Sequence, residues 1–426
     1  MKVLCWRIMM KKGQMIVVCG LVLAILLATG VSIKIGLSNR SEGQSQEPKQ
    51  ATVNPLTEKE EEQLKQADTL AMQYDYDGAI RLLQGKEFKE AEERVLDYKL
   101  RKSETIMWSD PALFSHLSFQ PLVALPEKAF SSAALMNYQA NHLTTEEFTR
   151  LLNELYERNY VLVRLSDIVK KKEDGTWQFV GVALPEGKKP LILSQENISY
   201  NDEMAEAGLS TKLVVDRDKR VKSCYRVGDN ELAGNYDLVP IVDQFVWKHP
   251  DFSYQGSKGA LAVTGAEGVF GYDVSSKKTT KEKERAKAVA DRLKETGWTL
   301  ASYSWAPINF NHSTLAMIQA DTIKYQEEVE PIIGETPLLM FPEGSDIGTW
   351  QPYDETNQSY LYVQEAGFSV FSQQDAAQES WGEFTPDYYR NSRIMVTGAA
   401  LEAGNASLTP FMDVADVIDK EARGLP

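Results

Sequence analysis

Short apolar runs alternate with amphipathic segments after Asp110, and this alternation restricts the fold more than any other feature of the sequence. The runs predicted as strands are residues 117–123, 160–165, 190–194, 260–264, 299–304, 337–341, 368–371 and 394–397. Strands that alternate with helices indicate a sheet with crossover helices. Eight such strands are enough to close a barrel. The sequence therefore predicts an α/β protein.

The predicted helices between these strands are residues 145–158, 238–248, 281–296, 313–333 and 360–366. The first has a clear start signal, because Thr144 and Glu147 have the spacing of a capping box. One segment departs from this pattern. Residues 212–227 alternate around a polar turn, which predicts a protruding β-hairpin inserted into the barrel.

The N-terminus carries an uncharged apolar run of 19 residues, 15–33 (MIVVCGLVLAILLATGVSI). At 1.5 Å per residue it is long enough to cross a bilayer as a helix. Basic residues lie mainly before the run, at Lys2, Arg7, Lys11 and Lys12. This bias predicts a cytoplasmic N-terminus, a single-pass anchor within residues 1–35 and an extracytoplasmic bulk at the cell membrane. A cleavable signal peptide is the alternative, because residues 28–30 (ATG) are small, but the length of the run favours the anchor.

Residues 36–54 are polar and rich in Gly, Ser, Gln and Pro, which predicts a flexible linker. Residues 55–107 have a helical pattern that begins with a Thr57–Glu60 capping box. The stretch AMQYDYDGAIRLLQG resembles a tetratricopeptide-type hairpin, but such arrays need about three repeats. We therefore expect a small helical stalk before the barrel domain at 108–426. A surface for a protein partner within residues 55–107 is the alternative.

The formal net charge of −15 makes nucleic acid an unlikely partner, since a phosphate backbone needs a basic surface. Cys224 is the one cysteine beyond the N-terminal apolar run. The sequence therefore has neither a disulfide framework nor a Cys-rich zinc motif.

Several separated segments resemble the polysaccharide deacetylases with NodB homology, particularly a membrane-anchored branch of Gram-positive bacteria. These segments are FSSAALMNYQANHLTTEEFTRLLNELYERNYVLVRLSDIV, KKPLILSQENISYND, DFSYQGSKGALAVTGAEGVFGY, GWTLASYSWAPINF, VEPIIG and FPEGSDIGTW. The resemblance covers roughly residues 114–400. It implies an irregular (β/α) barrel and a metal-dependent hydrolase that removes acetyl groups from amino-sugar polysaccharides.

The residues at the family's catalytic positions are unusual. The resemblance places the general base at Glu196 and a metal ligand at Asn197, whereas the family has two aspartates there. The family's pair of metal-binding histidines falls on Tyr303 and Pro307, and a further histidine position falls on Gln120. A neutral amide is a weak ligand for a divalent ion, a phenol is a poor one, and proline has no side-chain donor. No metal cofactor is therefore expected.

Two further family motifs lack their functional residue. The stretch near residues 340–344 has no arginine to orient the base, and the stretch near 396–398 has no histidine to act as an acid. The chain's four histidines are His116, His142, His249 and His312, and none falls at those positions. Of these, only His116, which opens the first barrel strand, is a candidate to point toward the site.

Aromatic residues are frequent in the loops that follow the predicted strands. They are Tyr200, Tyr303, Trp305, Phe310, Trp350, Tyr353 and Trp381. Flat aromatic faces suit sugar rings, so Tyr200, Tyr303, Trp305 and Trp350 are predicted to bind substrate. The alternative is that these rings only fill the mouth of the barrel.

Carboxylates also occur in these loops, at Glu196, Asp202, Glu267, Glu343 and Asp346. Two of them at a suitable separation could support glycoside hydrolysis without a metal, although acidic loop residues are usually solvated or cap helices.

The resulting hypothesis is a catalytically inactive, membrane-anchored homologue that binds a cell-wall glycan such as peptidoglycan. An active deacetylase is the competing hypothesis, with Glu196 as base and zinc or another divalent metal held by Asn197, Tyr303 and either His116 or Asp202. A third hypothesis treats the barrel as a scaffold for a protein partner bound by residues 55–107.

Overall fold

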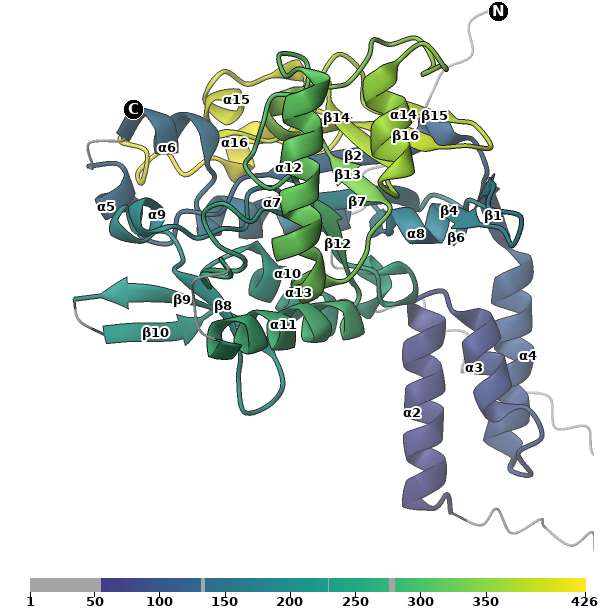
Figure 1. The fold of residues 1–426 in the computed structure, drawn as a ribbon. Helices are drawn as coiled ribbons and strands as arrows, with labels where there is room; N and C mark the ends of the chain where they lie inside the picture. The colour runs from purple at the N-terminus through teal and green to yellow at the C-terminus, as the bar shows by residue number, and fades with distance from the viewer. Residues whose placement is uncertain (1–54, 132–134, 229, 276–279) are drawn as a thin grey trace, which may run out of the picture. The chain divides into compact units, whose positions relative to one another are not determined.

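The computed structural model describes residues 55–426 except 132–134, 229 and 276–279 (Figure 1). Residues 56–426 form one compact unit. The predicted membrane-spanning run 15–33 and the linker 36–54 lie outside the described residues. Among the described residues, no helix has the length and hydrophobicity to cross a bilayer.

Seven parallel strands close into a barrel. In order around the ring they are β2 (Ser115–Phe119), β7 (Lys189–Gln195), β11 (Gly259–Val263), β12 (Trp298–Ser302), β13 (Leu338–Met340), β14 (Val370–Gln374) and β16 (Tyr389–Met395). Strand β16 pairs with β2 and completes the ring. The predicted barrel is therefore confirmed.

One of the eight predicted strands, residues 160–165, forms β3 (Tyr160–Leu162) and lies outside the ring. It pairs with the first three residues of β7, whereas Ser194 and Gln195 at the other end of β7 pair with β11. The long strand β7 thus has two neighbours on one side. The ring consequently has seven strands rather than eight.

Helices cover the outside of the ring (Figure 1). The longer ones are α7 (Thr145–Glu157), α10 (Leu238–Lys248), α11 (Thr280–Glu295), α12 (Leu315–Glu328) and α14 (Gln358–Glu365). Helix α7 begins with the predicted capping box, in which the Thr144 side chain accepts from the Glu147 backbone N–H and the Glu147 side chain accepts from the Thr144 N–H. Shorter helices are α5 (Pro126–Ala129), α6 (Leu135–Asn141), α8 (Leu165–Ile168), α9 (Asp202–Glu206), α13 (Glu330–Ile333), α15 (Gly398–Glu402) and α16 (Val414–Val417).

Side chains alternate between the two faces of each barrel strand, because the side-chain period of a strand is two residues. On β11, Leu261 and Val263 belong to the core shared with the outer helices. Ala260 and Ala262 belong to a second core that includes other inward-facing strand residues. Small side chains at inward positions leave room inside the barrel for large polar residues from other strands.

Two smaller antiparallel units flank the barrel. Strands β8 (Lys212–Val215), β9 (Val221–Val227) and β10 (Asn230–Gly234) form a three-stranded sheet, which confirms the hairpin predicted over residues 212–227. Strands β4 (Val169–Lys171) and β5 (Trp177–Phe179) form a second hairpin, and β15 (Gly382–Phe384) pairs with β16.

The helical region consists of α2 (Glu58–Met72), α3 (Tyr76–Leu83) and α4 (Lys89–Ser103). It is joined to the barrel domain by specific bonds. The Tyr74 hydroxyl donates to the Asp251 carbonyl at 2.7 Å, and the Gln255 N–H donates to the Gln73 carbonyl at 2.7 Å. Strand β1 (Thr105–Trp108) then pairs with β6 (Val182–Pro185). The helical region thus packs directly on the barrel domain.

Candidate functional site

A pocket of about 480 Å³ opens at the carboxyl ends of the barrel strands. We call it the carboxyl-end pocket. All seven strands of the ring contribute to it, through Gln120, Glu196, Asn197, Glu267, Tyr303, Pro307, Glu343, Gln374, Met395 and Thr397. Asn137, Tyr138, Asn141 and His142 line a second wall at α6, and Asn201, Glu203 and Met204 line a third at α9. Barrel enzymes build their active sites at this end.

The five catalytic positions suggested by the resemblance all line this pocket. Glu196 and Asn197 directly follow β7, Gln120 follows β2, and Tyr303 and Pro307 follow β12. Residues that are far apart in the sequence therefore meet at one site.

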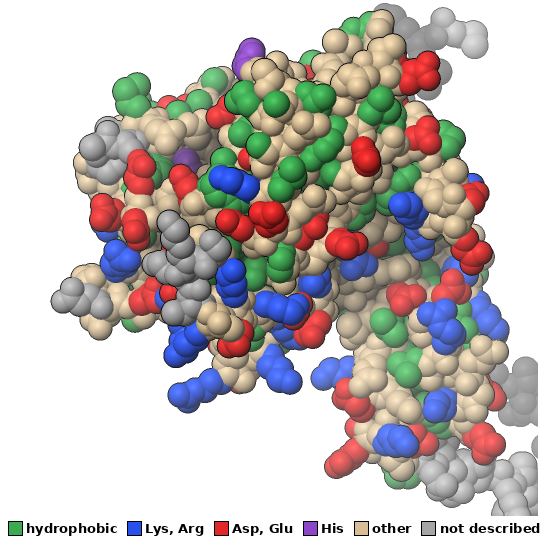
Figure 2. Space-filling model, viewed as in Figure 1, with side chains coloured by type: hydrophobic (Ala, Val, Ile, Leu, Met, Phe, Trp, Pro, Cys, Tyr) green, Lys and Arg blue, Asp and Glu red, His purple; other side chains and the backbone are tan. Residues whose placement is uncertain are grey.

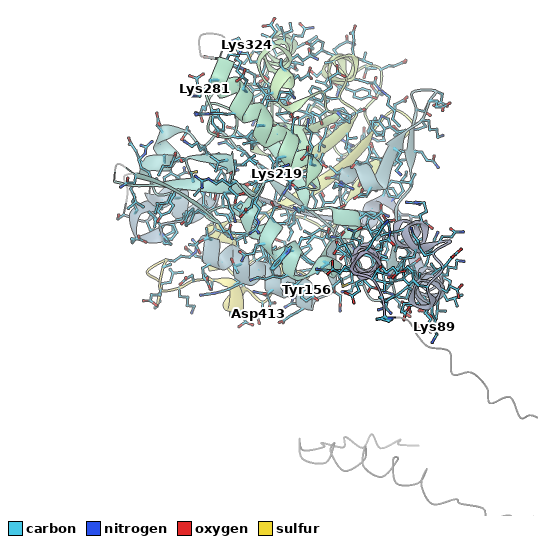
Figure 3. The ribbon with its side chains drawn as sticks, turned by 90° about the horizontal axis from the view of Figure 1, so that it is seen from below. Lys89, Tyr156, Lys219, Lys281, Lys324 and Asp413 are labelled. Carbon is cyan, nitrogen blue, oxygen red and sulfur yellow. The ribbon has the colours of Figure 1, made fainter. Side chains whose placement is uncertain are left out.

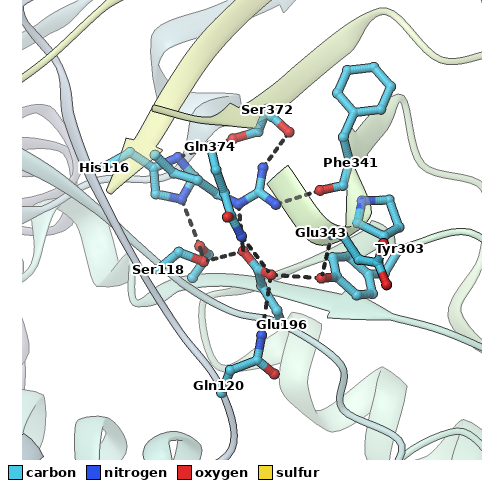
Figure 4. A network of polar contacts seen from close by, with 12 residues as sticks. His116, Ser118, Gln120, Glu196, Tyr303, Phe341, Glu343, Ser372 and Gln374 are labelled. Carbon is cyan, nitrogen blue, oxygen red and sulfur yellow. Dashed lines mark hydrogen bonds and ion pairs between the residues drawn. The ribbon is translucent and has the colours of Figure 1, made fainter. Parts of the chain in front are cut away.

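Glu196 is completely buried beneath the pocket, and several donors hold its carboxylate (Figure 4). They are Ser118 Oγ at 2.8 Å and Arg393 Nε at 2.6 Å from Oε1, Tyr303 Oη at 2.7 Å from Oε2, and Gln374 Nε2 at 3.2 Å from each oxygen. The Gln120 amide approaches Oε2 at 3.4 Å. A carboxylate has about four acceptor sites, and these donors use them.

Arg393 is the cation that balances Glu196. It lies on β16, its side chain is also completely buried, and Nε forms the ion pair. The other two nitrogens donate to backbone carbonyls, Nη1 to Ser372 and Nη2 to Phe341 at 2.6 Å. Each end of this buried pair is therefore satisfied, as a buried charge requires.

His116 lies in the barrel interior, on β2, and both of its ring nitrogens have polar partners. Nδ1 is 2.9 Å from Asn391 Oδ1, and Nε2 is 2.8 Å from Ser194 Oγ. Ser194 Oγ in turn donates to Ser118 Oγ at 2.9 Å, which leads to Glu196. Burial lowers the pKa of His116 to about 3, so the imidazole is neutral at pH 7. It supports the network from inside the barrel and does not line the pocket.

Tyr303 lies at the pocket floor and is only 4% exposed. Burial, together with the negative charge of Glu196, raises the pKa of the Tyr303 phenol well above its ordinary value. The hydroxyl therefore keeps its proton and donates it in the hydrogen bond to Glu196.

These residues do not fit the divalent metal that the resemblance implies. Tyr303 remains un-ionised, Pro307 has no donor, and the Asn197 side-chain oxygen accepts from Ser199 Oγ at 3.1 Å. Among the described residues, no group of three or more His, Cys, Asp or Glu side chains is arranged to hold a metal ion. Zinc sites need His, Cys or carboxylate ligands, and Glu196, the one carboxylate at the positions that the resemblance names, is already paired with Arg393.

The backbone adopts the left-handed conformation at several loop positions around the pocket. Asn197, Ser304 and Glu343 have φ of 51°, 60° and 54°, respectively. Such conformations are uncommon for residues other than glycine, and they tend to occur at functional sites. They turn the chain sharply after β7, β12 and β13, and so bring the side chains of these loops to the pocket.

The pocket surface is rich in amides and carries no positive charge among its described lining residues. The amides are Gln120, Asn137, Asn141, Asn197, Asn201 and Gln374. Three exposed carboxylates, Glu203, Glu267 and Glu343, lie around them. Amides both donate and accept hydrogen bonds, as a sugar hydroxyl or N-acetyl group requires.

Of the four aromatic residues predicted to bind substrate, the structure brings only Tyr303 into the pocket lining. The Tyr200 hydroxyl donates to buried Asp237 at 2.5 Å. Trp305 donates through Nε1 to Glu328 at 2.8 Å, with the Lys324 ammonium 4.0 Å from its ring centre. Trp350 is 78% exposed and does not line the pocket.

Only some of the loop carboxylates named in the sequence line the pocket. Glu196, Glu267 and Glu343 line the pocket. Asp202 is exposed at the first position of α9 and does not line it. Asp346 is buried, where it accepts from the Tyr353 hydroxyl and pairs with Arg390.

Sequence reasoning missed Arg393 and the α6 wall. The resemblance places the family's arginine near residues 340–344, whereas in the structure the cation beside Glu196 comes from β16. The predicted strand began only at Ile394, so it did not include Arg393. The α6 residues Asn137 and Asn141 are four positions apart, which places them on one face of a helix and could have indicated a polar surface.

No protein-family model matches this chain, and no curated protein matches it. Among solved structures, the chain is similar to one described as Streptococcus pyogenes deacetylase PplD in complex with acetate. The TM-score is 0.38 and the sequence identity 10%, over 71% of this chain and 100% of that chain. A likeness of this size carries no inference about chemistry, which must come from the residues of the pocket itself.

Proposed function

We propose that this protein is a deacetylase-like barrel that binds a glycan in the carboxyl-end pocket without hydrolysing it. The observation that carries the proposal is the state of Glu196. Its oxygens are held by Arg393, Tyr303, Ser118 and Gln374 in a buried network. A general base must reach the proton that it accepts, and here the acceptor sites are already used.

The lining of the pocket supports an amino-sugar glycan as the ligand class. Its amides suit hydroxyl and acetamido groups, and its exposed carboxylates disfavour acidic polymers. Peptidoglycan is the expected cell-wall ligand, from the resemblance rather than from any single contact.

Calorimetric titration of the full chain with a chitin tetramer and with its deacetylated chitosan counterpart tests this proposal. We expect the double variant Asn137→Ala and Asn141→Ala to weaken binding by about tenfold or more, because two polar contacts are lost. A matched control is Asn153→Ala with Gln178→Ala, two exposed positions outside the pocket lining. Equal affinity in the wild type and the pocket variant would place the glycan elsewhere.

Metal content and acetate release test the competing hydrolase. We expect less than stoichiometric metal in the purified chain and no acetate from a chitin oligomer. Stoichiometric zinc, with acetate release that Glu196→Gln abolishes, would overturn the proposal and make this protein an enzyme.

Attachment to the cell membrane remains a prediction from residues 15–33, and fractionation of cells that express the full chain would test it. A protein partner bound by residues 55–107, the alternative drawn from the sequence, also remains untested. In that region, Leu96 and Leu100 are exposed one turn apart on α4, and nothing in the described structure covers them.

A further inference from the structure

A second hollow, of about 530 Å³, lies at the opposite end of the barrel from the carboxyl-end pocket. Lys258 and Thr296, which line it, come just before the first residues of β11 and β12. Further lining residues come from α2, α10, α11 and the turn between β8 and β9. We call this hollow the amino-end pocket.

The amino-end pocket is basic although the chain as a whole has a net charge of −15. Its charged lining residues are Lys219, Arg220, Lys222, Lys258, Arg292 and Asp243. Five cations thus face one carboxylate. Figure 2 shows Lys and Arg side chains along the lower edge of the barrel domain, and Figure 3 places Lys219 on this underside.

The single carboxylate is already occupied. Asp243 Oδ1 accepts from the Lys258 ammonium at 2.6 Å and from Trp298 Nε1 at 2.9 Å. Arg292 pairs with Glu295 at 3.0 Å. The charges of Lys258 and Arg292 are therefore balanced within the fold.

Three other cations have no such partner. Lys222 donates to the neutral Asn235 side chain at 2.8 Å. Within the described part of the chain, no carboxylate forms an ion pair with Lys219, Arg220 or Lys222. Asp216 and Asp218 lie in the same turn, but they do not line the pocket, and Asp216 Oδ1 accepts from the backbone N–H groups of Asp218 and Arg220.

The turn that carries Lys219 and Arg220 is bonded to α11. Arg292 Nε on α11 donates to the Lys219 carbonyl at 2.5 Å, and Lys219 has a left-handed φ of 58°. Trp247 of α10, which also lines the hollow, is 79% exposed, and the polar side chains of Thr69, Gln244 and Thr296 line it as well. Unpaired cations, neutral donors and an exposed ring are thereby grouped around one concavity.

We propose that the amino-end pocket binds a polyanion that carries phosphate groups. Complementary charge supports a polyanion, since three unpaired cations share one hollow. Phosphate is favoured because its several acceptor oxygens can bind an arginine fork and neutral donors together. A phosphate anion in solution is favoured over a lipid surface because the site is concave and lies between α2 and the hairpin turn.

Fluorescence titration of the full chain in neutral detergent micelles tests the proposal, with inorganic tripolyphosphate as the probe. We expect Lys219→Glu with Arg220→Glu to weaken binding by about tenfold or more, since two charge-assisted contacts are lost. The matched control is Lys170→Glu with Lys171→Glu, which makes the same change in net charge at two exposed residues of β4. Both positions of each pair are on the surface, so all variants should fold.

Three results would overturn the proposal. Equal losses in the two double variants would show attraction to net charge alone. Binding only when the micelles contain phosphatidylglycerol would assign the cations to a lipid headgroup. Tighter binding of polygalacturonate than of tripolyphosphate would make carboxylate, rather than phosphate, the preferred group. Glycan binding at the other end of the barrel should be unchanged in all variants, so a failure of one proposal leaves the other intact.

Discussion

Glu196 and Arg393 form a completely buried ion pair at the base of the carboxyl-end pocket. Both side chains are 0% exposed, and the pair is surrounded by neutral donors and carbonyls. Removing two charges from water is costly, and only good geometry offsets that cost. The free energy of unfolding should therefore fall more when one partner is replaced than when both are replaced.

Replacement of Arg393 by methionine tests this expectation. We expect Arg393→Met to lower the free energy of unfolding by about 3–5 kcal/mol, because Glu196 remains buried without a cation. Adding Glu196→Gln should recover part of this loss. Urea denaturation of both variants, with exposed Arg81→Met as the control, provides the measurement. If single and double variants unfold at the same urea concentration, the loss comes from the unpaired carbonyls of Ser372 and Phe341 instead.

The buried histidines predict how stability depends on pH. Burial lowers the pKa of His116 to about 3 and that of His142 to about 4, whereas an unfolded histidine titrates near 6.5. The unfolded chain thus binds more protons between these values. The contribution of these two neutral histidines to the free energy of unfolding should be complete above pH 6.5. It should fall as the pH drops, with a slope on the order of 1 kcal/mol per pH unit for each histidine.

Urea midpoints between pH 7.5 and 4.5 measure this slope. Because carboxylates contribute to the slope in every variant, the informative quantity is the difference between variants. His116→Gln should give a shallower slope than the wild type, and Asn153→Ala, which removes no titratable group from an exposed position, should give the same slope as the wild type. Parallel curves for all three proteins would mean that His116 takes up a proton in the folded state.

At the scale of elements, helix α6 depends on the end of the chain for its position. Arg423, near the C-terminus, pairs with Glu147 through Nε at 2.6 Å and Nη2 at 2.8 Å. The same guanidinium donates to the carbonyls of Gln139 at 2.7 Å and His142 at 2.9 Å. It thereby fixes the segment that presents Asn137, Asn141 and His142 to the carboxyl-end pocket.

We expect Arg423→Met to reduce both stability and glycan affinity, although Arg423 does not line the pocket. The stability loss should be about 3 kcal/mol or more, because Glu147 is left buried without its cation. Affinity for the chitin tetramer should fall several-fold, and amide exchange should quicken in α6. Lys420→Met, at an exposed position nearby, is the control. Unchanged affinity, together with lower stability, would show that the α6 wall does not contribute to binding.

The elements could be predicted from the sequence where a local pattern identifies them. The Thr144 capping box and the apolar stripe of α7 are such patterns, and helix α7 starts at the residue they indicate. Strand pairing is not local, so the sequence did not show that β3 stays outside the ring. The predicted start of β16 was five residues too late, because the strand includes two charged residues, Arg390 and Arg393. Both are buried, and their partners are distant in the sequence.

The same reasoning applies to the candidate site. Gln120, Glu196, Asn197, Tyr303 and Pro307 could be grouped in advance because the resemblance gave their positions, and the structure brings them to one pocket. The positions of the Tyr200 and Trp305 side chains could not be predicted in this way. Each is set by a partner in another element, Asp237 for Tyr200 and Glu328 for Trp305, and no short-range pattern reveals these partners.

At the scale of the whole molecule, the helical region and the barrel domain share packing. Tyr74 is 7% exposed, its ring stacks on Tyr254 with centres 6.5 Å apart, and it belongs to the same apolar cluster as Val161 and Ile192 of the barrel sheet. Deletion of residues 55–107 would therefore expose part of the barrel core. Such a deletion cannot by itself separate loss of a partner surface from loss of stability.

A substitution within the helical region shows whether the two parts unfold together. We expect Tyr74→Ala to lower the free energy of unfolding of the barrel domain by about 3 kcal/mol, as truncation of a large buried ring usually does. Exposed Lys65→Ala on α2, the helix that precedes Tyr74, should change it by less than about 0.5 kcal/mol. Tryptophan fluorescence, to which the buried Trp298 of β12 contributes, and far-ultraviolet circular dichroism should then follow one shared transition in urea. Two separate transitions, with only the helical signal moved by Tyr74→Ala, would mean that the helices unfold independently and that the barrel does not depend on them.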